Sequence, residues 1–136
     1  METSSVGQSK TSSLATPRRN LNLTESSLLD LEASLTRLGG DHTLLDRLIE
    51  IFLEDYPGLL QQATVGLQEG DARHVERAAH SIKGLVANFG AGPAGRQAMR
   101  VEELARAGSL SEASMALELL RDEVDRLAAA LRQRQP

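Results

Sequence analysis

With 136 residues the chain has the length of one domain, and its 23 Leu and 17 Ala against 9 Val plus Ile and 3 aromatic residues favour helices over an all-β sandwich or a parallel sheet. The absence of cysteine excludes disulfides, thiolate metal sites and cysteine nucleophiles. The net charge of −4 argues against nucleic-acid binding, and the lack of a signal peptide or an apolar run of about 18 residues predicts a cytoplasmic protein with no membrane partner.

Residues 1–20 differ in composition from the rest of the chain. They are rich in Ser and Thr and contain only four scattered apolar residues. Such a segment cannot offset the entropy lost on ordering. We therefore expect a disordered tail or interdomain linker over residues 1–20 and a helical domain over residues 21–136.

The first two predicted helices both end at glycine. Leucines at 28, 31, 35 and 38 recur at helical spacing before Gly39-Gly40, which predicts a short amphipathic helix. Asp41 suits the N-cap of a long second helix that runs to Gly70, and Pro57 within it predicts a kink. Its expected apolar positions are Leu44, Leu45, Leu48, Ile51, Phe52, Leu59, Leu60, Ala63 and Leu67.

Three more helices complete the pattern. Asp71 caps a third helix over about residues 72–88, and Gly90 follows it where glycine favours a helix stop. The fourth begins near Pro93 and the fifth at Ser111. The sequence thus predicts an all-α fold, an antiparallel up-down four-helix bundle with a short additional N-terminal helix. The expected apolar positions of the last two helices are Ala94, Ala98, Met99, Val101, Leu104 and Ala105, then Met115, Leu117, Leu119, Leu120, Val124, Leu127, Ala128 and Leu131.

One histidine of the third helix is expected to face solvent. The helix has a seam of apolar residues at alternating spacings of three and four, as a core-facing helix does. His80 lies roughly opposite that seam at about 100° per residue. Position alone leaves His80 as either an ordinary surface residue or a reactive one. The seam consists of Val75, Ala78, Ile82, Leu85 and Phe89.

Two neighbours on the same stripe favour a reactive histidine. Gly84 occupies an outward position in a helix interior, where glycine costs roughly 1 kcal/mol relative to alanine, so we infer that a partner must approach the ring closely. Lys83, the only lysine after Lys10, suits a phosphoryl group because its mobile ammonium neutralises phosphoryl oxygens. An imidazole is largely neutral at pH 7 and keeps a nucleophilic lone pair. These residues predict nucleophilic attack on phosphorus.

The segment Ala79-His80-Ser81-Ile82-Lys83-Gly84, continuing through Asn88-Phe89-Gly90-Ala91, resembles the signature of histidine-containing phosphotransfer (HPt) domains of bacterial phosphorelays. In that signature lysine stands three residues after the histidine, and glycines stand four and ten residues after it. The resemblance covers about residues 24–132. It implies a four-helix bundle in which His80 accepts a phosphoryl group from an aspartyl phosphate on a receiver domain and passes it to another receiver.

The resemblance also implies roles for residues around the histidine. Lys83 would stabilise the phosphohistidine, Gly84 would admit the receiver, and Gly90 would close the third helix. The other residues with an implied role are Arg73, Glu76, Arg77 and Ala87 as a docking rim, with Glu102 and Arg106 of the fourth helix supporting the site.

The expected partners are response-regulator receiver domains. The resemblance implies a phosphoryl carrier without catalytic turnover of its own, and no cofactor, since Mg²⁺ belongs to the acidic pocket of the receiver. The resemblance leaves open whether the chain is free-standing or part of a hybrid sensor kinase. Its charged outer faces predict a monomer.

An exposed histidine on a helix also occurs in two alternatives to a phosphorelay carrier. A histidine-kinase dimerisation bundle also exposes a histidine on a helix, but that family places an acidic residue after it, where this chain has Ser81. A helical module that binds receivers or other signalling proteins without being phosphorylated remains the second hypothesis.

No metal site is expected. His42 and His74 are interpreted as surface residues in the first turns of their helices. A zinc site favours ligands four residues apart on a helix, whereas His74 and His80 are six apart and point in different directions. The acidic run of Asp46, Glu50 and Glu54 is interpreted as a solvated helix face.

Overall fold

The computed structural model describes residues 31–90 and 92–134, which form helices and turns. The expected tail over residues 1–20 lies outside the described residues. Of the short first helix, residues 31–37 are described and are helical, with a turn over residues 38–40. The long helices are α2 (His42–Glu69), α3 (Ala72–Ala87), α4 (Gly92–Arg106) and α5 (Leu110–Arg134).

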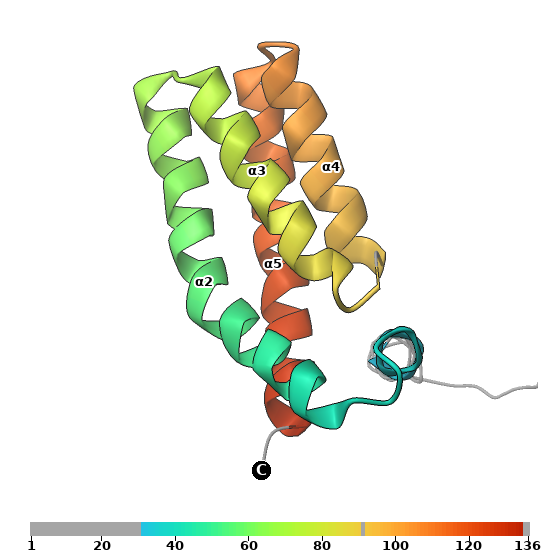
Figure 1. Cartoon of the computed structure of the whole chain (residues 1–136). Coiled ribbons are helices and arrows are strands. Elements are labelled where there is room, and N and C mark those ends of the chain that lie inside the picture. The colour runs from blue at the N-terminus through green and yellow to red at the C-terminus, as the bar shows by residue number, and fades with distance from the viewer. Residues whose placement is uncertain (1–30, 91, 135–136) are drawn as a thin grey trace, which may run out of the picture.

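The four long helices form an antiparallel up-down bundle, as the sequence predicts (Figure 1). Successive helices pack against each other along the chain, and α2 also contacts α5 to close the bundle. Helix α3 thus packs between α2 and α4, with one side left for solvent. None of the described helices is long and apolar enough to cross a membrane.

Local capping fixes where α3 begins, and therefore the rotation of its residues. The side chain of Asp71 accepts a hydrogen bond of 3.1 Å from the backbone N–H of His74, as an N-cap does. Asp41 caps α2 in the same way, through the N–H of Leu44 at 2.9 Å. Gly70 separates α2 from α3 in a left-handed conformation with φ of 68°, which glycine adopts without strain.

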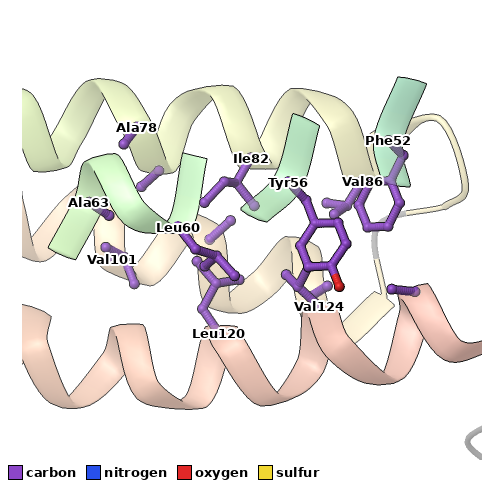
Figure 2. Close-up of a cluster of buried hydrophobic side chains, with 14 of the residues drawn as sticks. Phe52, Tyr56, Leu60, Ala63, Ala78, Ile82, Val86, Val101, Leu120 and Val124 are labelled. Atoms are coloured by element: carbon purple, nitrogen blue, oxygen red, sulfur yellow. The ribbon is translucent and has the colours of Figure 1, made fainter. Parts of the chain in front are cut away.

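Aromatic side chains within the core hold α3 in place. Phe52 stacks on Tyr56 with 5.1 Å between the ring centroids, and the Phe52 and Phe89 rings form a T-shaped pair with 5.6 Å between their centroids. Figure 2 shows Ile82 and Val86 of α3 among these α2 side chains. Phe89 is buried just beyond the end of α3, so the chain is anchored there before α4 begins.

The buried face of α3 differs from the predicted seam at two positions, one of which is Ala79, buried beside the predicted Ala78. Val86 is buried, whereas Leu85 is only half-buried. An α-helix has 3.6 residues per turn rather than the 3.5 of a strict heptad, so the buried stripe drifts forward along the chain. The drift leaves His80 exposed.

Four other apolar residues that we expected on core faces are exposed. The helices have leucine or methionine on more than one face, so apolar character alone does not select the inward one. In α5, Met115 and Leu119 lie one turn apart on the outer side, while Ala116 and Leu120 are buried. The four residues are Leu44, Met99, Met115 and Leu119. In α2, helix formation continues without a break through Pro57. Ile49 and Tyr56 are buried although they are not among the predicted apolar positions, whereas the predicted Ile51 is only half-buried.

Candidate functional site

His80 lies in the middle of α3, on the side facing away from the core. Its side chain is 67% exposed, while Val75, Ala78 and Ile82 of the same helix are buried. The outward direction expected from the sequence is therefore observed. An imidazole with this exposure is accessible to another protein.

Glu102 of α4 supports the histidine from the bundle side. It stands among buried residues on the face of α4 that includes Val101 and Ala105, and only 7% of its side chain is exposed. Its Oε2 atom lies 2.8 Å from Nδ1 of His80, across the contact between α3 and α4. A buried carboxylate fixes the imidazole at one nitrogen.

Two cationic side chains complete the contacts of Glu102. Nζ of Lys83 donates to Oε1 at 2.8 Å, and Nη2 of Arg106 donates to Oε2 at 3.1 Å. Burying a lone carboxylate is costly because the charge loses its hydration, and these donors compensate for that loss. The two carboxylate oxygens thus hold Lys83 on one side and His80 with Arg106 on the other.

This network determines which nitrogen of the ring is free. The hydrogen bond from Lys83 lowers the pKa of Glu102, and the hydrogen bond from His80 adds to this, against burial, which acts to raise it. An ionised carboxylate only accepts hydrogen bonds, so Nδ1 of His80 must carry the proton that is shared with it. In the neutral ring, the lone pair is then on Nε2.

A hollow of about 490 Å³ lies beside the histidine. Glu76 and Arg106 meet at its edge, where Nε of Arg106 donates to Oε2 of Glu76 at 2.8 Å. This ion pair raises the pKa of Arg106 above its ordinary value. The hollow is lined by Arg73, Glu76, Arg77, His80, Ser81, Glu102 and Arg106.

The remaining predicted site residues occupy the C-terminal half of α3 and the turn after it. Gly84 is exposed, and a Cβ atom added there would meet no atom within 4 Å. Lys83 is 33% exposed and is held by Glu102. Ala87 is exposed at the last position of α3, and Gly90 follows with φ of 91°, a conformation that favours glycine at a helix stop.

The structure brings Glu102 and Arg106 into the site, where the resemblance alone had suggested them. A sequence signal for Glu102 exists, since a charged residue interrupts the apolar stripe of Ala98, Val101 and Ala105. The other histidines lie elsewhere: His74 is half-buried, and Nδ1 of His42 is 3.0 Å from Nη2 of Arg134. Among the described residues, no group of three or more His, Cys, Asp or Glu side chains is placed to hold a metal ion.

Comparison with protein families identifies the bundle. The family model described as Hpt domain matches residues 47–130. The chain belongs to the Hpt domain family. Hpt domains have a phosphotransfer role in phosphorelays, act as carriers rather than catalytic enzymes, and interact with receiver domains of two-component systems.

A solved structure agrees with this assignment. The chain is similar to histidine-containing phosphotransfer protein B (HptB) from Pseudomonas aeruginosa PAO1, with a TM-score of 0.66 and 27% sequence identity. The similarity covers 88% of this chain and 95% of the HptB chain. The curated proteins gave no match. The similarity extends over nearly the whole Hpt bundle.

Proposed function

We propose that His80 accepts a phosphoryl group from an aspartyl phosphate on a receiver domain and passes it to another receiver. The observation that supports this most strongly is the hydrogen bond of 2.8 Å between Nδ1 of His80 and the buried carboxylate of Glu102. It leaves Nε2 as the nucleophilic atom of an exposed, oriented ring. A surface histidine without a catalytic role needs no such partner.

The transfer step follows from this arrangement. The lone pair of Nε2 attacks phosphorus, an N–P bond forms, and the bond between phosphorus and the acyl oxygen of the receiver breaks. The receiver aspartate leaves as a carboxylate with the electron pair of that bond. The proton on Nδ1 stays on the ring, whose positive charge faces Glu102. The reverse sequence delivers the phosphoryl group to the next receiver.

Lys83 and Gly84 have complementary roles in this proposal. The ammonium of Lys83 lies one turn from His80 and is available to neutralise phosphoryl oxygens. Gly84 presents no side chain on the same stripe, so a receiver helix can approach the ring. Arg73, Glu76 and Arg77 would meet the receiver at the rim of the contact.

Transfer from a phosphorylated receiver, with Mg²⁺ present for the receiver, tests the proposal. We expect the labelled phosphoryl group to appear on the wild type and on a His74→Gln variant, which removes the other histidine of α3. We expect none on His80→Gln. The label should be lost in acid and retained in alkali, as phosphohistidine is. Label that persists on His80→Gln would overturn the assignment. Receivers that bind without transferring label would favour a binding module instead.

We also propose that the bundle acts as a cytoplasmic monomer, either free-standing or as part of a hybrid sensor kinase. The exposed ring of His80 and the hollow beside it offer a surface for one receiver at a time. Light scattering coupled to size exclusion should give the monomer mass with or without phosphorylation. A stable dimer would contradict this proposal.

A further inference from the structure

Arg106 is joined to the reacting histidine through a shared acceptor. Oε2 of Glu102 accepts from Nδ1 of His80 at 2.8 Å and from Nη2 of Arg106 at 3.1 Å. The distance between Nδ1 of His80 and Nη2 of Arg106 therefore cannot exceed the sum of these two distances. The Arg106 side chain is nevertheless 59% exposed, so it has room to move.

Glu76 holds the other side of the same guanidinium. Its Oε2 accepts from Nε of Arg106 at 2.8 Å, and the two residues come from different helices, α3 and α4. Glu76 also precedes His80 by four residues, so both side chains lie on one stripe of α3 and both line the hollow. A phosphoryl group on His80 would therefore be close to the Glu76 carboxylate.

We propose that Glu76 is a positioning residue whose ion pair holds Arg106 while His80 is unphosphorylated. When His80 is phosphorylated, Arg106 exchanges Glu76 for the phosphoryl oxygens. This inference rests on the proposed phosphorylation of His80. It assigns Glu76 a role in setting how much of the phosphoryl group stays on this chain, in addition to any contact with the receiver.

The exchange is favoured by charge and by geometry. A phosphoryl group carries close to two negative charges and three acceptor oxygens, so it attracts Arg106 and repels Glu76. A guanidinium has five N–H donors in a planar fork, so Arg106 can keep its bond to Glu102 while turning other donors to the phosphoryl group. Lys83 is bound to the opposite oxygen of Glu102, so the two cations can approach the phosphoryl group from different sides.

Dependence on Arg106 distinguishes this role of Glu76 from direct repulsion between Glu76 and the phosphoryl group. If Glu76 acts through Arg106, its carboxylate stabilises the unphosphorylated state by an ion pair that is given up after transfer. Removing that carboxylate should favour the phosphorylated chain, and most of this gain should require Arg106. Direct repulsion would give the same gain with or without Arg106.

The equilibrium constant for transfer between this chain and one receiver domain tests the coupling. This constant depends only on the free energies of the two proteins when they are apart, each in its phosphorylated and unphosphorylated form. A variant that only weakens docking therefore changes the rate of transfer and leaves the equilibrium constant unchanged. The set is the wild type, Glu76→Gln, Arg106→Gln and the double variant. Glu118→Gln, an exposed position on α5, is the control for the charge change.

We expect Glu76→Gln to shift the equilibrium toward the phosphorylated chain, about two- to fivefold more when Arg106 is present than in the Arg106→Gln background. Glu76→Asp keeps the carboxylate and should retain wild-type behaviour, and Glu118→Gln should cause no shift. Thermal unfolding checks that each variant is folded.

Equal shifts in both backgrounds, or no shift in either, would overturn the role of Glu76. If no phosphoryl group reaches His80 in the wild type, the proposed function fails, and this inference fails with it. If His80 is phosphorylated normally but Glu76 and Arg106 act independently, only the inference fails.

Discussion

Gly84 gives a prediction in which stability and activity change in opposite directions. The residue lies inside α3, one turn after His80, and a Cβ atom there would meet no atom within 4 Å. Glycine in a helix interior is less stable than alanine by roughly 0.5–1 kcal/mol. Gly84→Ala should therefore stabilise the fold, raising Tm by about 2–4 °C for a chain of this size.

A longer side chain at the same position should obstruct transfer. Gly84→Gln keeps the helix, since glutamine is a good helix former and the space around the position is open. Its side chain would occupy the surface that a receiver must approach. A misplacement of about 1 Å in a reacting pair can cost about 100-fold in rate, and a flexible glutamine can partly move aside, so we expect transfer to slow by about tenfold or more.

The chain offers a matched control for this variant. Gly58 is also exposed in the interior of a helix, α2, and a Cβ atom added there also meets nothing within 4 Å. Gly58→Gln should leave transfer unchanged. The assays are rapid-quench transfer from a phosphorylated receiver and thermal unfolding by circular dichroism. A folded Gly84→Gln protein that accepts the phosphoryl group at the wild-type rate would refute the argument that the empty position admits the receiver.

Three further predictions concern the contacts of Glu102. Glu102→Gln should slow transfer by about tenfold in a rapid-quench assay. An amide offers one acceptor oxygen where the carboxylate uses two, and a hydrogen bond to a charged group contributes about 1.5–3 kcal/mol. An unchanged transfer rate would contradict the role of Glu102 in orienting His80. Lys83→Ala should shift the transfer equilibrium away from the phosphorylated chain. It should also raise the pKa of Glu102, measured by NMR titration, because the hydrogen bond from Lys83 makes the largest contribution to lowering that pKa. Because that pKa is lower in the folded chain than in the unfolded one, Glu102 stabilises the fold above its ordinary carboxyl pKa, and this contribution is lost as pH falls through the folded value. Urea unfolding across acidic pH should then show a weaker pH dependence for Glu102→Gln than for the wild type, and identical slopes would count against the network.

The sequence predicts α3 well because its determinants are local. Asp71 caps the helix and Gly90 follows its end, so the boundaries depend on residues within a few positions of them. The apolar seam then sets which side faces the core, and His80 falls opposite it. The same local logic finds Gly84, because an outward glycine needs no knowledge of the partner helix.

The sequence does not predict features that depend on how the helices rotate against each other. The bond between His80 and Glu102 joins residues 22 positions apart and depends on which face α4 turns toward α3. Met115 and Leu119 lie outside the core for a related reason, since α5 has apolar residues on two faces and packing selects one. The ion pair of Glu76 and Arg106 likewise requires the relative placement of two helices.

The most direct measurement is ³¹P NMR of the phosphorylated protein, with assignment of the nitrogen that carries the phosphoryl group. Because Glu102 holds the proton on Nδ1, we expect a single phosphohistidine species on Nε2 of His80, absent from His80→Gln. Phosphorylation on Nδ1, or on a residue other than His80, would contradict the proposal that the buried carboxylate orients His80 for phosphoryl transfer.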